Sequence, residues 1–402
     1  MLHVWRWILP ACLFVIVGFS VPSCGGTSNN EVVTDGGGSE ASQEPASLPT
    51  KEGCNGTKLL VIPEDTSLVG PWPVGARTVK LGSYTVEVLY PAKPGSEEGK
   101  TKIRYDIRKQ LPPEDVDKIP DDKNPWQDCN CYSDLSPDTE RGPYPVVWFI
   151  HGTAGFRTQS LSHMQHWASR GFVVISADHP GINLGDVLKL NLQFGQQGAD
   201  LRAMLKVFRT QPESLSFLKG SLDMSRMAVS GHSAGGSALA DLGDEEGVKV
   251  LIPMAAGGTS SEKPVQSTLV LGGMEDGVVP YKRQQDGYKS SPKPKRLVGL
   301  KKAGHLAFSD LCELGREQGG LLKIASDNGV KIPDAFGSLI DTLATDGCKE
   351  GQLASAKGWE IIHFVSSAVL EETLHCSVTA AKQLEQLTQR YPEVAEFKEE
   401  LK

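Results

Sequence analysis

The stretch MAVSGHSAGGSALA, residues 227–240, contains the pattern that decides the fold. A short apolar run precedes a Gly-x-Ser-x-Gly motif, and a sequence able to begin a helix follows it. This order predicts that Ser233 lies at a sharp strand-to-helix turn, where Gly231, Gly235 and Gly236 leave room for its strained backbone. The motif alone has about 0.3 chance matches in a chain so rich in glycine. A purely structural Gly/Ser turn is therefore the alternative.

A serine at such a turn becomes a nucleophile only when a base and an orienting acid accompany it. When the serine stands between a strand and a helix, these partners follow it at the ends of later strands, the acid first and the histidine second. Asp276 stands in the turn MEDGVVP, directly after the apolar run STLVLGG, and is the predicted acid. Glu275 and Asp286 are its rivals. A surface loop without a catalytic role is the alternative for this turn.

The predicted base is His305, which follows the next apolar run, KRLVGLKK, behind a glycine. A histidine can both accept and release a proton near neutral pH, as a general base must. His363 and His375 compete for the role, but both lie in a strongly periodic helical segment that favours packing or surface positions. His151 and His232 flank backbone turns and are interpreted as structural neighbours of the oxyanion-binding region.

Attack by a serine also requires two N–H donors for the negatively charged oxygen that forms. Ala234, the residue after the nucleophile, is expected to supply one of them. The second is expected from the loop HGTAG, residues 151–155, which follows an earlier apolar run. Its small residues let the backbone approach a substrate, and the Thr153 amide is the predicted donor.

From residue 145 onward, the pattern alternates between strands and helices. Continuous apolar runs rich in β-branched residues are typical of strands that are buried on both faces. Strands alternating with amphipathic helices predict a mainly parallel sheet with helices on both faces, and the two antiparallel strands of 76–93 should lie at one edge. The expected strands are 145–152, 171–181, 226–230, 248–256, 267–273 and 295–302, and the expected helices are 161–170, 198–210, 357–375 and 378–402.

The first 53 residues are not expected to belong to the folded domain. Residues 1–23 combine an early cation with an apolar run of signal-peptide length, and VPSC resembles a bacterial lipobox that implies cleavage before Cys24 and lipid attachment to its sulfur. Ordinary signal cleavage and an uncleaved anchor remain alternatives. Residues 24–53 are rich in Gly, Ser and acidic side chains and are expected to form a flexible tether. The protein is therefore expected to be exported, either lipid-anchored in a bacterial cell envelope or secreted.

Eight cysteines are present, and six remain when Cys12 and Cys24 are set aside with the leader. An even number in an exported domain predicts three disulfides whose pairing the sequence leaves open. Cys129 and Cys131 are separated by one residue and are each expected to have a distant partner, whereas a Cys312–Cys348 bond would close a polar segment. The CNC spacing does not fit a zinc site, so no metal is expected. The six candidates are Cys54, Cys129, Cys131, Cys312, Cys348 and Cys376.

The length and the net charge of the chain limit the possible binding partners and the number of domains. The 402-residue chain carries a formal charge of −8 and has no basic cluster, which argues against nucleic acid as a partner. One domain is expected over residues 54–402, with insertions near 94–144 and 310–355 that have room to shape or cover a pocket.

The motifs HGTAG, GHSAGG, MEDGVVP and AGHLAFSD together resemble the α/β-hydrolase superfamily. They are similar to the branch that contains platelet-activating factor acetylhydrolases, dienelactone-hydrolase-like proteins and cutinase-type polyester hydrolases. The resemblance implies an α/β-hydrolase fold that acts on carboxylic esters without metal or cofactor. It also implies Ser233, Asp276 and His305 as the catalytic triad, with Thr153 and Ala234 as oxyanion donors. The acetylhydrolases usually carry an aromatic residue where this chain has Ala234.

The expected function is that of an esterase or lipase acting on a small-molecule or lipid ester through an acyl-enzyme. Its membrane contact is expected to come from the N-terminal lipid anchor. Two classes of alternative remain. The same triad can serve a serine peptidase or an acyltransferase, and the fold can also carry a non-catalytic binding protein on the cell surface.

Overall fold

The computed structural model describes residues 46–47, 58–259, 265–336 and 339–402. The predicted signal peptide, the lipidation site Cys24, nearly all of the predicted tether and Cys54 lie outside the described residues. Two residues of the tether, β1 (Ala46–Ser47), pair with β2 (Lys58–Leu59). No helix among the residues described is long and apolar enough to cross a membrane.

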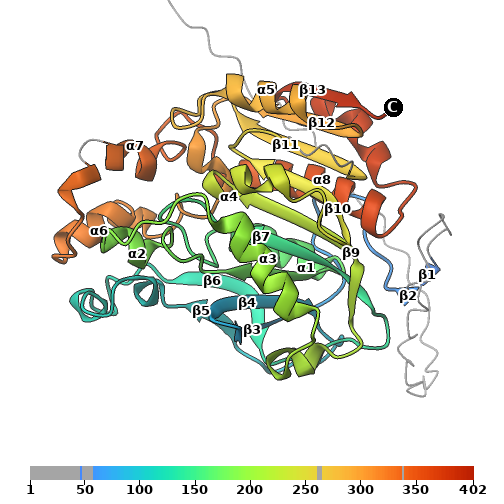
Figure 1. The fold of residues 1–402 in the computed structure, drawn as a ribbon, viewed down its shortest axis with the longest axis horizontal. Coiled ribbons are helices and arrows are strands. Elements are labelled where there is room, and N and C mark those ends of the chain that lie inside the picture. Colours follow the sequence, from blue (N-terminus) through green and yellow to red (C-terminus); the bar gives the residue numbers. More distant parts are fainter. Residues whose placement is uncertain (1–45, 48–57, 260–264, 337–338) are drawn as a thin grey trace, which may run out of the picture. The chain divides into compact units, whose positions relative to one another are not determined.

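One mixed sheet organises the described part of the chain (Figure 1). Its strand order is β13-β12-β11-β10-β9-β7-β8-β4-β3-β6-β5, and the central strands from β8 to β12 all run parallel. The predicted parallel sheet of buried apolar strands is confirmed. The strands are β3 (Val74–Leu81), β4 (Tyr84–Pro91), β5 (Lys102–Tyr105), β6 (Gln127–Ser133), β7 (Tyr144–Ile150), β8 (Val173–Ala177), β9 (Leu222–His232), β10 (Val248–Met254), β11 (Ser267–Gly273), β12 (Lys295–Leu300) and β13 (Val394–Glu400).

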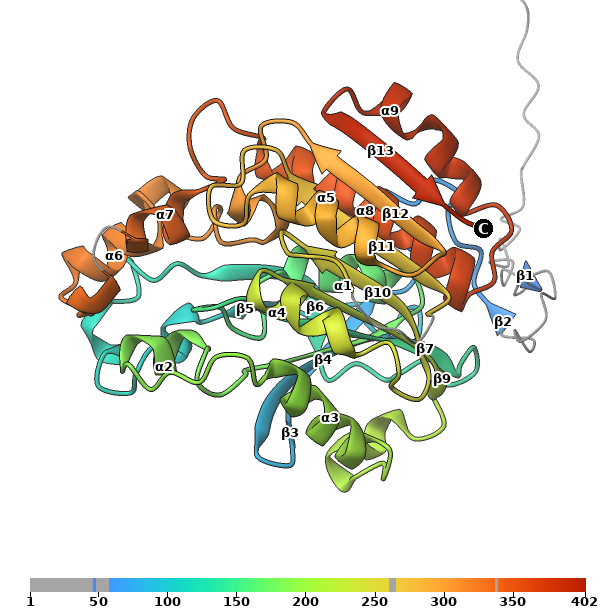
Figure 2. The ribbon, with the colours of Figure 1, turned by 45° about the horizontal axis from the view of Figure 1, so that its top comes forward.

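Helices cover both faces of the sheet, as predicted (Figure 2). Side chains alternate along β7, so that Val147 and Phe149 join a core with α1 and α8, while Val146, Trp148 and Ile150 join a second core with α3. The helices are α1 (Leu161–Ser169), α2 (Leu184–Leu188), α3 (Gln197–Phe208), α4 (Ala234–Ser237), α5 (Tyr281–Ser290), α6 (Leu321–Asp327), α7 (Leu339–Thr345), α8 (Ser355–Leu374) and α9 (Leu387–Arg390).

The end of the chain differs from the prediction of one helix over 378–402. A 3₁₀ turn and α9 occupy the first part, and β13 then pairs antiparallel with β12. Pro392 explains the change, because it cannot continue a helix and restricts Tyr391 to extended backbone, with φ −121° and ψ 94°. Phe397 then packs against the core, opposite Val298.

The residues before β7 also depart from the prediction. The antiparallel hairpin β3–β4 is present, but it lies inside the sheet between β8 and β6 rather than at the edge. Residues 94–144 supply β5 and β6, which pair with each other and form that edge. Strand β6 is rich in polar residues, and this composition concealed it in the sequence.

Disulfides account for five of the six candidate cysteines. Cys129 and Cys131 bond to each other, which contradicts the expectation of distant partners. Side chains two residues apart in a strand point to the same face, and here the two Cα atoms are 5.0 Å apart, a distance that a disulfide can span. Cys312 bonds to Cys348, and Cys376 is also disulfide-bonded.

Seven of the eight histidines in the described part of the chain are buried, and His363 is partly buried. Burial lowers the pKa of six of them, because the protonated ring loses its hydration. Burial acts in the opposite direction on three carboxyls, Glu87, Asp310 and Glu371, whose pKa values are raised. The six histidines are His151, with a pKa of about 4, His163, His166, His232 and His375, with pKa values of about 3, and His363, whose pKa is well below the usual value.

These histidines predict that acid destabilises the fold. Below the unfolded histidine pKa of about 6.5, the unfolded chain binds protons that the native chain does not, so the free energy of unfolding falls as the pH falls. The three carboxyls oppose this effect but are fewer. Denaturant unfolding should therefore show lower stability at pH 5 than at pH 7, and a His363→Leu variant should lose up to about 1.4 kcal/mol per pH unit of that slope. Equal stability at both pH values would contradict the prediction.

Candidate active site

Ser233 lies between the last residue of β9 and the first residue of α4, with φ 57° and ψ −120°. A non-glycine residue rarely adopts this backbone conformation, which costs about 1–3 kcal/mol. The turn is held because the Ser233 N–H donates to the carbonyl of Met254, 2.9 Å away. A Cβ on Gly235 would lie 2.1 Å from the carbonyl oxygen of Ile150, so only glycine permits the close approach of this turn to β7.

The structure brings Ser233, His305 and Asp276 into one chain of hydrogen bonds. The Ser233 Oγ lies 2.8 Å from the Nε2 of His305, whose Nδ1 lies 3.0 Å from the Oδ2 of Asp276. The Asp276 side chain is fully buried and the His305 side chain is nearly so. With a carboxylate at Nδ1, the neutral ring carries its proton on that nitrogen, so Nε2 accepts from the serine hydroxyl.

The loop after β11 fixes the carboxylate of Asp276. Its Oδ1 accepts from the backbone N–H groups of Val278 and Val279, at 2.9 and 2.7 Å, and its Oδ2 accepts from the Gln284 side chain at 3.1 Å. These three donors fix the orientation of the carboxylate.

The rival acids are placed elsewhere. Glu275 is exposed, and Asp286 forms an exposed ion pair with Lys282. The competing histidines contact residues other than Ser233. His363 stacks on His166, with ring centroids 4.1 Å apart, and His375 bonds to the carbonyl of Arg170.

The loop after β7 lies against the serine. A Cβ added to Gly152 would be 3.1 Å from the Cβ of Ser233, which measures how closely the two backbones approach. Neighbouring amides are already used, since Ala154 N–H donates to the carbonyl of Ile182. Among the described residues, no acceptor is seen for the amides of Thr153 and Ala234. The N–H groups of both predicted oxyanion donors are therefore not used by the described protein groups; Ala234 directly follows Ser233, and Thr153 directly follows Gly152.

A residue that the sequence did not indicate, Gln159, links these parts. Its Oε1 accepts from the N–H of Gly152 at 3.0 Å, and its Nε2 donates to the Nδ1 of His232 at 2.9 Å. The other nitrogen of His232 then donates to the carbonyl of His305, 2.9 Å away. Because burial lowers the pKa of His232 to about 3, the neutral ring is favoured near pH 7 and can both accept and donate. A lone glutamine in a loop carries no motif by which it could have been found.

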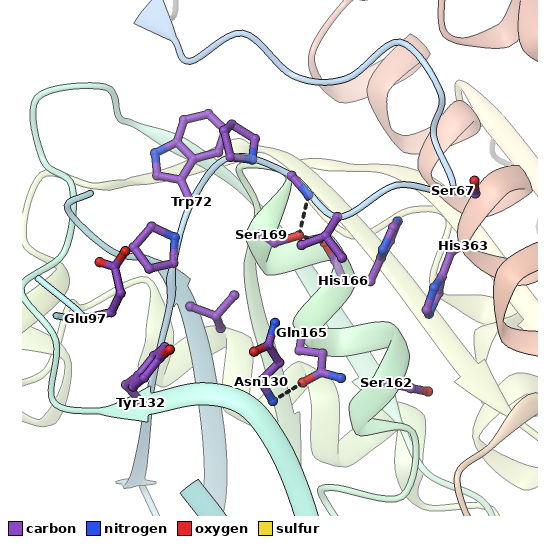
Figure 3. A pocket seen from close by; sticks show the side chains of 15 residues that line it. Ser67, Trp72, Glu97, Asn130, Tyr132, Ser162, Gln165, His166, Ser169 and His363 are labelled. Atoms are coloured by element: carbon purple, nitrogen blue, oxygen red, sulfur yellow. Dashed lines mark hydrogen bonds between the residues drawn. The ribbon is translucent and has the colours of Figure 1, made fainter. Parts of the chain in front are cut away.

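A separate cavity of about 340 Å³ lies beside α1 (Figure 3). Its wall combines Trp72, Tyr132 and Glu97 with His166 and His363, and no member of the serine–histidine–aspartate chain lines it. In the described part of the chain, no group of three or more His, Cys, Asp or Glu side chains is arranged to hold a metal ion.

Comparison with known proteins gives one family match. Residues 124–181 are similar to the family described as platelet-activating factor acetylhydrolase, isoform II. The matched stretch runs from just before β6 to the loop after β8 and contains Thr153, but it ends before Ser233. A sequence search of curated proteins finds no match. The match and the sheet topology agree on the α/β-hydrolase fold and support a hydrolase of that type.

The turn at Ser233 predicts a sharp difference between two glycines. Gly235→Ala places a methyl group against the Ile150 carbonyl and should destabilise the fold by at least about 2 kcal/mol. Gly257→Ala is the matched control, because nothing lies within 4 Å of the added Cβ, and it should change stability by less than about 0.5 kcal/mol. Urea unfolding of the two variants tests this, and equal stabilities would contradict the described turn.

Proposed function

We propose that this chain is a serine carboxylic ester hydrolase of the esterase or lipase type. The observation that carries the proposal is the continuous hydrogen-bond chain from the Ser233 hydroxyl through His305 to Asp276, with 2.8 and 3.0 Å links. A buried carboxylate, an imidazole and a serine in this order form the arrangement that activates a serine hydroxyl for attack on a carbonyl.

In the proposed acylation, the Nε2 of His305 takes the proton of the Ser233 hydroxyl as the Oγ attacks the ester carbonyl carbon. Asp276 holds the ring in the tautomer that can do this and stabilises the imidazolium that forms. The amides of Thr153 and Ala234 donate to the oxygen that becomes negative; each such donor is worth about 10²–10³ in turnover. Collapse of the tetrahedral species releases the alcohol, which takes its proton from His305.

In deacylation, water takes the place of the serine hydroxyl as the nucleophile. His305 removes a proton from a water molecule, whose oxygen attacks the acyl carbon bound to Ser233. The carboxylic acid leaves, and Ser233 recovers its proton from His305. Every proton transfer in the cycle is thus assigned to a group of this chain.

We further propose that the enzyme is exported and held at a membrane by lipid on Cys24. The disulfides of the described domain support an oxidising compartment. The leader and the VPSC sequence support lipid attachment, and residues 24–53 provide a tether between the anchor and the domain. An ester presented at or near the membrane surface is the substrate that such an arrangement favours.

Hydrolysis of p-nitrophenyl esters of increasing chain length tests the function. The wild type should hydrolyse at least one ester, and Ser233→Ala should lower kcat/KM by at least about 10³-fold. Ser225→Ala, a change at an exposed serine on the same strand, should have no effect. Peptide amides and acceptor alcohols in the same panel distinguish a peptidase or an acyltransferase. Wild type without ester hydrolysis, or full activity in Ser233→Ala, would contradict the proposal.

A further inference from the structure

We infer that Asp346 is a positioning residue. It holds the loop after β11, which contains Asp276 (the acid loop), and the loop after β12, which contains His305 (the base loop), in a fixed relative position. The inference rests on the proposed function, because it assigns Asp346 a role through Asp276 and His305. Asp346 follows α7, in the segment 310–355 that the sequence marked as an insertion. The Cys312–Cys348 disulfide ties this segment back to the chain seven residues after His305.

A single oxygen of Asp346 contacts both loops. Its Oδ2 accepts from the backbone N–H of His305 at 2.9 Å and from the backbone N–H of Gly277 at 2.8 Å. Gly277 directly follows Asp276, so this oxygen bonds the base residue itself and the neighbour of the acid. Asp346 is buried, with 4% of its surface exposed, so these hydrogen bonds are shielded from water.

The backbone of this segment is pressed against the base loop. The carbonyl of Asp346 accepts from the N–H of Leu306 at 2.7 Å. Gly347 has φ 107°, and a Cβ there would lie 2.8 Å from the same N–H, while a Cβ on Gly304 would lie 2.4 Å from the Gly347 nitrogen. Two facing glycines thus permit a contact that larger residues would prevent.

The segment is anchored from its other side as well. The N–H of Gly347 donates to the side chain of Gln352 at 2.9 Å, and the N–H of Leu353 donates to the carbonyl of Lys302 at 2.7 Å. The disulfide at Cys348 adds a covalent link. Asp346 is therefore fixed within its own segment, through Gln352 and the disulfide, and against the loop after β12, through Lys302 and Leu306.

Without Asp346, fewer contacts hold the two loops together. A backbone bond from Glu275 to the carbonyl of Ala303 joins them before the functional residues, and the contact between the His305 ring and Asp276 joins them at the site. A base must lie within hydrogen-bond reach of the nucleophile. A shift of about 1 Å in His305 relative to Ser233 can lower turnover by about 10²-fold.

The role of Asp346 depends on the place of its oxygen rather than on its charge. Both bonds end on Oδ2, and the side-chain oxygen of asparagine can accept two hydrogen bonds from the same position. In the described part of the chain, Asp346 bonds the backbone N–H of His305 and not its imidazole ring, so its loss should act on kcat and leave KM nearly unchanged. An electrostatic role would instead be lost in both the alanine and the asparagine variants.

The test measures kcat and KM of the full-length protein on the best p-nitrophenyl ester for Asp346→Ala, Asp346→Asn and a control. Asp346→Ala should lower kcat about 10- to 100-fold with KM within about twofold, and Asp346→Asn should stay within about threefold of the wild type. Asp327→Ala changes an exposed carboxylate of the same segment and should match the wild type. Circular dichroism selects folded protein, and Asp346→Ser replaces the alanine variant if that variant does not fold.

The outcomes separate this inference from the proposed function. An inactive wild type overturns the function and with it the premise. With an active wild type, full kcat in Asp346→Ala overturns the inference alone. Equal loss in Asp346→Asn and Asp346→Ala also overturns it, because charge rather than the acceptor position would then control the rate.

Discussion

The backbone turn at Ser233 is the constraint on which the site depends. It exists only because glycine at position 235 lets the start of α4 lie against the carbonyl of Ile150 at the end of β7. The same turn is bonded to Met254 at the end of β10. The packed ends of three neighbouring strands thus maintain the strained backbone at Ser233, and the serine hydroxyl lies at the carboxyl ends of the central strands.

The other predicted site residues lie at the same end of the sheet because the central strands are parallel. The loops after β7, β11 and β12 contain Thr153, Asp276 and His305, and parallel strands bring their carboxyl ends together although the residues are far apart in sequence. Hydrogen bonds between loops then set the fine geometry. Gln159 and His232 connect the β7 loop to His305, and Asp346 connects His305 to the loop that contains Asp276.

Local patterns account for what the sequence predicted and for what it missed. Runs of β-branched residues predicted the parallel strands, and the order of Ser233, Asp276 and His305 predicted side chains that the structure places within hydrogen-bond distance. Strands β5, β6 and β13 were not predicted because they are rich in polar residues and only partly buried, and β5 is also short. Pro392 is the signal that could have indicated the last. Gln159 bonds the amide of Gly152 and the ring of His232, and Asp346 bonds the amides of Gly277 and His305. Such single contacts leave no periodicity or motif.

Mass spectrometry of the protein after reaction with a fluorophosphonate tests the central claim most directly, because this reagent forms a stable bond with a serine whose hydroxyl is activated by a base. The account predicts one adduct on each protein molecule, located in the peptide that contains Ser233 and absent in His305→Gln. An adduct on another serine, or equal labelling of Ser233 after removal of His305, would contradict it.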